Sequence, residues 1–242
     1  SVDVSNLPAL ESLGTYYSGK ITTINTSNSP NLKAINATSS NSLTNIEGME
    51  DNILLEVFKA PYTKLKKLDF THYTKLKEVN IMSSSVEEIK GLADAGANLT
   101  TLQLAQTHIS SLDVSQNPNL TSIDLYSVQE LTALDVTHNP KLTSLRAPFT
   151  SITELKLTNN PELVTLKVSH CKLKKLDITL LPKLKALYAG SQSPNGFLAN
   201  IEVTMTAAQK TTLNQVRPFK EGENDDKAKY EDTNSWVKAI VR

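Results

Sequence analysis

Hydrophobic residues recur along the chain in two short phrases that alternate with each other. The first phrase places apolar residues at positions 1, 4 and 6 and then a turn, as in Ile109-Ser-Ser-Leu112-Asp-Val114-Ser-Gln-Asn117-Pro118. The second phrase repeats the 1, 4 and 6 spacing, as in Leu120-Thr-Ser-Ile123-Asp-Leu125. Successive side chains of an extended strand point to opposite faces. The spacing therefore predicts short strands with positions 1, 4 and 6 inward and positions 3, 5 and 7 outward.

Both phrases return with a period of 21 to 23 residues over most of the chain. The first phrase starts at Ile21, Leu43, Leu65, Val86, Ile109, Leu131, Ile152 and Leu173, and the second at Leu32, Leu54, Leu76, Leu99, Leu120, Leu142, Leu163 and Leu184. The widest departure lies near Val86, where 91–96 inserts about two residues. One such coil cannot bury its own leucines, but stacked coils share one core. The pattern predicts a solenoid of about eight coils, an α/β-type repeat in which both sides of each coil are extended.

The two ends of the chain depart from the repeat. Residues 2–10 match the middle of a first phrase, so we expect the chain to begin inside a repeat. After residue 190 the pattern stops, and residues 191–242 read as an α+β capping segment behind a solenoid of residues 1–190. Within that segment we expect a strand over 198–205, a helix opened by the capping box Thr206-Ala-Ala-Gln209, and a closing strand from Trp236.

The two phrases, written L-x-x-L-D-V-S-x-N-P and L-T-x-L-x-L, resemble bacterial surface leucine-rich repeats, most of all the short-coil class seen in internalin J and in proteins of gut-commensal bacteria. The resemblance implies a right-handed leucine-rich-repeat solenoid. It also implies a secreted or cell-surface protein, lipid-anchored through a removed N-terminus, that acts in recognition without catalysis. In that class a cysteine or asparagine often occupies position nine of the concave phrase. Here that position holds Ser84, Thr107, Thr150 and Cys171.

Charge and composition exclude several functions. The chain has 25 basic and 25 acidic residues, so it lacks the basic excess that favours nucleic acid or membrane surfaces. No apolar run approaches the roughly 18 residues of a membrane span. Cys171 is the single cysteine and forbids an intrachain disulfide. We expect a monomer without a cofactor.

The sequence offers little catalytic or metal chemistry. His72 and His138 lie three coils apart, and His170 and Cys171 point apart in an extended segment, which leaves Cys171 in the core. An outward aspartate column is interrupted by lysines, and we interpret it as a solvated or salt-bridged ladder, with calcium binding as the alternative. The Asn-Pro pairs read as structural turns. We expect neither an enzyme nor a metal site.

The outward columns of the second phrase supply the candidate binding residues. Aromatic residues make up 5% of the chain, yet several fall on these columns beside cations. Exposed aromatic residues next to arginine are common anchors of protein interfaces. The candidate binding residues are Phe58, Tyr126, Arg146, Phe149, Lys167, His170 and Tyr188.

Three functions fit this concave surface. The first is adhesion at the bacterial surface through a protein partner, the second is carbohydrate binding through the same aromatic residues, and the third is a structural spacer. Aromatic pairing that only stabilises the sheet, or that contacts the C-terminal segment, is the alternative to a binding role.

Overall fold

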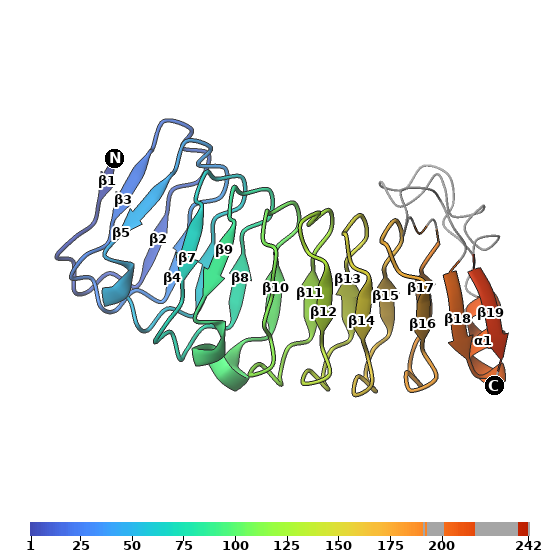
Figure 1. The fold of residues 1–242 in the computed structure, drawn as a ribbon. Coiled ribbons are helices and arrows are strands. Elements are labelled where there is room, and N and C mark those ends of the chain that lie inside the picture. Colours follow the sequence, from blue (N-terminus) through green and yellow to red (C-terminus); the bar gives the residue numbers. More distant parts are fainter. Residues whose placement is uncertain (191, 193–200, 216–236, 242) are drawn as a thin grey trace.

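The computed structural model describes residues 1–190, 192, 201–215 and 237–241, and it shows an elongated stack of coils (Figure 1). Each coil contributes a short strand to one continuous parallel sheet of nine strands, here called the long sheet. Its strands are β2 (Ser12–Gly14), β4 (Ala34–Asn36), β6 (Val57–Lys59), β8 (Glu78–Asn80), β10 (Thr101–Gln103), β11 (Ser122–Asp124), β13 (Ser144–Arg146), β15 (Thr165–Lys167) and β17 (Ala186–Tyr188). The predicted mostly-β repeat solenoid is confirmed.

The first phrases form the opposite side of the stack, here called the outer face, and their pairing is discontinuous. Its strands are β1 (Val2–Asp3), β3 (Thr23–Asn25) and β5 (Asn45–Glu47); β7 (Lys67–Asp69) and β9 (Glu88–Lys90); β12 (Ala133–Asp135) and β14 (Glu154–Lys156); and β16 (Lys175–Asp177), β18 (Ile201–Met205) and β19 (Val237–Val241). Two 3-10 helices, η1 (Met49–Asp51) and η2 (Leu92–Asn98), interrupt the turns. The coils are therefore held together most regularly through the long sheet.

The core is a column of aliphatic side chains between the two faces. Positions 1, 4 and 6 are buried as predicted, with Leu120, Ile123 and Leu125 all fully inaccessible to solvent. Burial of a leucine or isoleucine side chain contributes about 1.5–3 kcal/mol relative to exposure. Stacking of equivalent residues from successive coils thus stabilises a unit that no single coil could sustain.

Phe58 is a core residue, and the prediction that its side chain faces outward is wrong. The second phrase of its coil begins at Leu55, which is fully buried, instead of at Leu54. Strand pairing places Phe58 opposite Ile35 and Val79, and its ring meets the ring of Phe70 edge-on at 5.3 Å. A shift of one residue exchanges the two faces of a strand. The extra residue lies in the turn that contains η1, which the sequence pattern did not resolve.

The Asn-Pro turns carry a ladder of buried asparagines on the outer face, in agreement with their structural interpretation. The Nδ2 of Asn139 donates to the carbonyl oxygens of Val114 at 2.9 Å and Asn117 at 2.8 Å in the preceding coil. Asn160 repeats the arrangement one coil later, with the carbonyls of Val136 and Asn139. Each side chain therefore ties its own turn to the one before it.

The opposite turns use smaller groups at position nine of the second phrase. Ser84 and Thr107 donate to carbonyls of their own turns, at 2.6 Å and 2.7 Å. Cys171 is fully buried and lies 3.2 Å from the Thr150 hydroxyl and 3.2 Å from the Ala147 carbonyl oxygen. The prediction that Cys171 faces the core is confirmed.

The described elements near the C-terminus continue the outer face. Strand β18 pairs in parallel with β16 and β19, and helix α1 (Ala207–Gln215) follows β18. The predicted capping box is present, since Thr206 Oγ1 accepts from the Gln209 amide while Gln209 Oε1 accepts from the Thr206 amide. Gln209 Nε2 also donates to the Leu181 carbonyl at 3.1 Å. The helix is thereby attached to the last coil.

The structure leaves two features predicted at this end untested. Trp236 lies outside the described residues. The division into a solenoid of residues 1–190 and a capping segment of residues 191–242 stays a prediction. In the part of the chain that the structure describes, no helix has the length and apolar character needed to cross a membrane.

Candidate binding surface

The outward side chains of four adjacent strands form one row on the long sheet. Pairing of β11, β13, β15 and β17 aligns Asp124, Arg146, Lys167 and Tyr188. These four side chains point outward, because the residues before and after each of them in the strand point into the core or lie at its edge. Adjacent strands lie about 4.8 Å apart, so the row spans about 14 Å. Four coils thus present their position-five side chains to a common surface.

Cation–aromatic contacts hold this row together. The guanidinium carbon of Arg146 lies 4.3 Å from the centroid of the Tyr126 ring, and Arg146 Nη1 lies 3.2 Å from Asp124 Oδ2. The Lys167 ammonium lies 4.9 Å from the centroid of the Tyr188 ring. A cation over an aromatic face contributes about 0.5–2 kcal/mol, more where water is excluded. Arg146 is 28% exposed, so its head group is held in a partly desolvated position.

Phe149 and His170 extend the row along the adjoining turns. Their rings are stacked at 4.3 Å between centroids with 6° between planes, and the Tyr126 ring meets Phe149 edge-on at 5.5 Å. The six residues therefore form a connected surface, here called the aromatic–cation patch. It consists of Tyr126, Arg146, Phe149, Lys167, His170 and Tyr188.

The backbone at Phe149 and His170 is unusual for such bulky residues. Both have positive φ angles, 60° and 54°, in the turn that follows the strand. Equivalent turns elsewhere hold Ser39, Ser83 and Ser127 in the same conformation, and also Gln106, Tyr17 and Tyr62. Glycine and asparagine adopt this conformation most easily, and other residues pay roughly 1–2 kcal/mol. The turn geometry therefore gives no reason for an aromatic ring at these two positions.

Six of the seven predicted binding residues come together in the patch, and Phe58 does not. Sequence reasoning placed Asp124 in the correct column but did not select it as a site residue. Its role is to orient Arg146, which is one coil further along. The sequence could have indicated Asp124, because a carboxylate directly opposite a cation on a neighbouring strand is a favourable cross-strand pair.

The outer aspartate column has a structural explanation. Asp135 Oδ1 accepts hydrogen bonds from the backbone amide of Thr137 at 3.0 Å and from its hydroxyl at 2.6 Å. Those hydrogen bonds lower the pKa of Asp135. Asp69 and Asp177 make the same contacts with the threonine two residues later. Each aspartate therefore closes its own turn.

The described residues provide no cluster of three or more histidine, cysteine, aspartate or glutamate side chains placed to hold a metal ion. Lys156 Nζ lies 3.3 Å from Asp135 Oδ2, which agrees with the salt-bridged interpretation of the column. Burial raises the pKa of the Cys171 thiol to about 11, opposite to the shift that activates a nucleophilic cysteine.

Comparison with known proteins identifies the fold. No protein-family model and no curated protein sequence matches the chain. Among solved structures, the functional domain of InlJ from Listeria monocytogenes, described as including a cysteine ladder, superimposes with a TM-score of 0.64 at 21% identity, covering 85% of this chain and 52% of that one. YopM, a leucine-rich effector protein from Yersinia pestis, gives a TM-score of 0.53 at 24% identity, covering 76% and 53%.

The protein is therefore a leucine-rich-repeat solenoid. Its structural neighbours include bacterial leucine-rich-repeat proteins, in agreement with the resemblance of its two phrases. The chain spans about half the length of each of these two neighbours. At these levels of identity the likeness establishes the fold alone.

Proposed function

We propose that this chain is a non-enzymatic recognition module of a bacterial cell-surface or secreted protein, and that it binds a protein partner through the aromatic–cation patch. The observation that carries the proposal is the convergence of two cation–aromatic contacts and a stacked ring pair on one outward surface built from four coils. Tyrosine and arginine are enriched among the residues that dominate binding energy at protein interfaces.

Preorganisation supports this assignment. Arg146 is held between the Tyr126 ring and the Asp124 carboxylate before any partner arrives. Ordering a free arginine on binding costs about 0.5–1.5 kcal/mol of side-chain entropy. A side chain that is already positioned loses less, so more of its contact energy contributes to affinity.

The charge of the patch favours a partner segment of a particular kind. Arg146 and Lys167 provide two cations, whereas Asp124 provides one carboxylate that already pairs with Arg146. Tyr126, Phe149 and Tyr188 supply apolar ring surface between them. An acidic segment that carries aromatic or aliphatic side chains complements both features.

A double substitution tests the proposal. The double variant Tyr126→Ala/Arg146→Ala removes the central contact, and Asn36→Ala/Lys59→Ala is its matched control in the same column of the long sheet. We expect the wild type and the control to capture the same partner from host extracellular extracts, with at least about tenfold weaker capture by the patch variant. All three proteins should unfold within a few degrees of each other. Equal capture by the patch variant contradicts the proposal.

Carbohydrate binding is the second candidate, because the parallel Phe149 and His170 rings offer a flat surface on which a sugar can stack. A glycan array with the same three proteins separates the two functions. Array signal that depends on Tyr126 and Arg146, without protein capture, would replace a protein ligand by a glycan. Binding that survives every patch substitution would leave only the spacer role.

A further inference from the structure

Three tyrosines are exposed near the N-terminal end of the long sheet, away from the aromatic–cation patch. Tyr17 is 81% exposed, Tyr16 57% and Tyr62 48%. Tyr16 and Tyr17 follow β2, and Tyr62 follows β6 (Figure 1). Among the described residues, none of the three rings contacts a cation or another aromatic ring. Their apolar faces are therefore accessible to a ligand.

Backbone pairing places Tyr17 and Tyr62 in one column, two coils apart. The Tyr17 amide donates to the Thr38 carbonyl at 3.0 Å, and the Ser39 amide donates to the Pro61 carbonyl at 3.0 Å, so Ser39 lies between the two tyrosines. Tyr17, Ser39 and Tyr62 have nearly the same φ angle, 53°, 58° and 59°. Because adjacent strands lie about 4.8 Å apart, the two tyrosines are about 10 Å apart along the stack.

The fold does not require tyrosine in this column. Ser83 and Ser127 occupy equivalent turns in the same conformation. Tyr16, in contrast, is positioned by its own strand, because a Cβ at Gly14 would lie 2.6 Å from Tyr16 Cε2. The absent side chain leaves the space that the Tyr16 ring fills. A ring that is already positioned loses less side-chain entropy when a ligand binds.

The polar groups around the rings favour a neutral ligand. Ser39 and Thr38 lie between the two coils that carry the tyrosines, and both side chains are uncharged. Lys59 on β6 is paired with Glu78 at 3.0 Å. Residues that dominate protein interfaces cluster in packed pockets from which water is excluded. Rings that are exposed and separated by a coil do not form such a pocket.

We propose that Tyr16, Tyr17, Ser39 and Tyr62 bind a neutral, extended β-1,4-linked glycan that runs across strands β2, β4 and β6. In such a glycan every second sugar presents the same face, and the two columnar tyrosines are separated by about the length of one disaccharide unit. The C–H groups of a sugar face pack on the electron-rich face of an aromatic ring. Tyr17 and Tyr62 therefore stack on alternate sugars, and the Ser39 hydroxyl bonds to the sugar between them.

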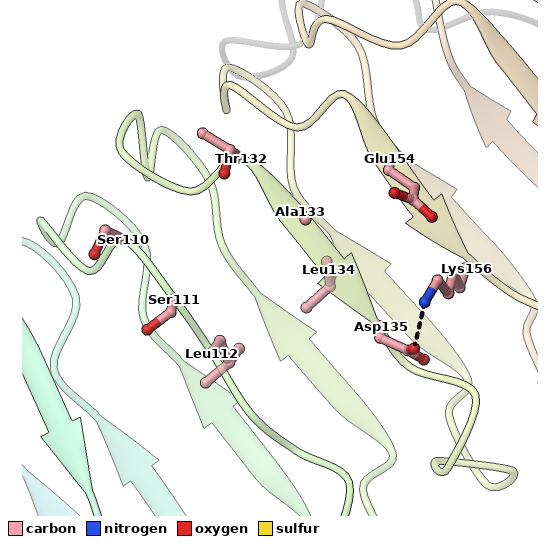
Figure 2. Close-up of a pocket in the computed structure, with 9 residues that line it drawn as sticks. All are labelled: Ser110, Ser111, Leu112, Thr132, Ala133, Leu134, Asp135, Glu154 and Lys156. Atoms are coloured by element: carbon pink, nitrogen blue, oxygen red, sulfur yellow. Dashed lines mark ion pairs between the residues drawn. The ribbon is translucent and has the colours of Figure 1, made fainter.

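The hollow on the outer face has a different chemistry (Figure 2). It has a volume of about 340 Å³, and none of the described side chains that line it is aromatic. Figure 2 shows Asp135 and Lys156 of its lining joined in an ion pair, at 3.3 Å. It therefore lacks the ring surface on which a sugar stacks.

Isothermal titration calorimetry with cellohexaose and chitohexaose, both neutral and β-1,4-linked, tests the proposal. We expect at least one of them to bind the wild type. The corresponding disaccharides reach only one ring and should bind at least about tenfold more weakly. Maltohexaose, which is α-1,4-linked and curved, should not bind.

Two double variants test the rings. Tyr17→Ser/Tyr62→Ser gives both turns the residue that the fold uses at Ser83, so it should unfold as the wild type does and bind the hexasaccharide at least about tenfold more weakly. Tyr17→Phe/Tyr62→Phe keeps the rings and should bind within about threefold of the wild type. Gln106→Ser, two coils beyond Tyr62 in the same column, is the matched control.

A third double variant tests the spacing. Ser39→Tyr/Tyr62→Ser keeps two rings but brings them to adjacent coils, about 4.8 Å apart. It should bind as weakly as Tyr17→Ser/Tyr62→Ser, because neighbouring sugars present opposite faces.

The inference is overturned if neither hexasaccharide binds the wild type, or if the serine variant or the shifted pair binds as tightly as the wild type. Protein capture that depends on Tyr17 and Tyr62 without hexasaccharide binding would replace the glycan by a protein partner. The patch variant Tyr126→Ala/Arg146→Ala should bind the hexasaccharide as the wild type does, so this site and the patch are tested separately.

Discussion

The imidazole of His170 lies parallel to the ring of Phe149, with 4.3 Å between centroids and 6° between planes. The two residues occupy equivalent positions in consecutive coils and share a positive φ angle. The repeat thus sets their spacing, and stacking is its direct consequence. A positive φ is less favourable for a bulky side chain than for glycine or asparagine, so the turn itself does not select an aromatic ring at these positions.

Phe149→Asn should preserve stability while it weakens the proposed partner binding. Asparagine tolerates a positive φ, so the variant releases roughly 1 kcal/mol of backbone strain and loses about 0.5–1.5 kcal/mol of ring stacking. We expect the free energy of unfolding, measured by urea titration, to change by less than about 1 kcal/mol. Partner binding should weaken. A loss of stability above about 3 kcal/mol would show instead that Phe149 acts as a core residue.

Phe58→Ala tests the corrected register of the third long-sheet strand. Phe58 is fully buried and packs against Phe70, so truncation should cost about 3–5 kcal/mol. The neighbouring substitution Lys59→Ala removes only a surface ion pair with Glu78 and should cost less than about 1 kcal/mol. Thermal unfolding of the two variants distinguishes the registers. The reverse order would restore the predicted outward position of Phe58.

Asn139→Ala measures how much the buried asparagine ladder contributes to the free energy of unfolding. The substitution deletes two buried hydrogen bonds, to the carbonyls of Val114 and Asn117, and should cost about 2 kcal/mol. Asn159→Ala is the control, because its side chain is exposed and makes a single bond to the Thr137 carbonyl. We expect a loss below about 1 kcal/mol for the control by chemical denaturation. Similar losses for both variants would mean that burial adds nothing to these bonds.

Cys171 should make stability fall at alkaline pH. Burial raises the pKa of its thiol from 9.0 to about 11 in the folded chain. The folded state therefore holds the proton more tightly than the unfolded state, and stability from this group is present below pH 9 and lost as pH rises toward 11. Between those values the wild type should lose more stability than Cys171→Ala.

Thiol labelling provides an independent check on the same group. At pH 8 the folded protein should resist a thiol reagent that labels the unfolded chain within minutes. Rapid labelling of the folded protein would show that the thiol is accessible.

Much of the fold and part of the site follow from the sequence. The 1, 4 and 6 spacing predicted the buried face of nearly every coil, because strand geometry converts spacing directly into direction. The capping box at Thr206 and Gln209 could also be predicted from the sequence, because its hydrogen bonds join residues only three positions apart. The patch residues could be predicted as well, because they occupy outward positions of the second phrase in successive coils.

Three features were decided by tertiary structure. An extra residue near η1 moved Phe58 into the core, and its position depended on how that turn packs against the preceding coil. The pairing of Arg146 with both Tyr126 and Asp124 required the distances between coils. The missing backbone pairing at 110–113 could not be predicted from the phrase Ile109 to Val114, because its hydrophobic spacing is the same as in the phrase Leu131 to Val136.

The sequence by itself determined the repeat, the identity of the core residues in the regular coils, and the columns that face outward. Tertiary structure alone decided which outward residues touch and where the outer strands stop pairing. The physical reason is that side-chain direction is a local property of extended backbone, whereas hydrogen bonding between coils depends on separations set by every turn in the stack.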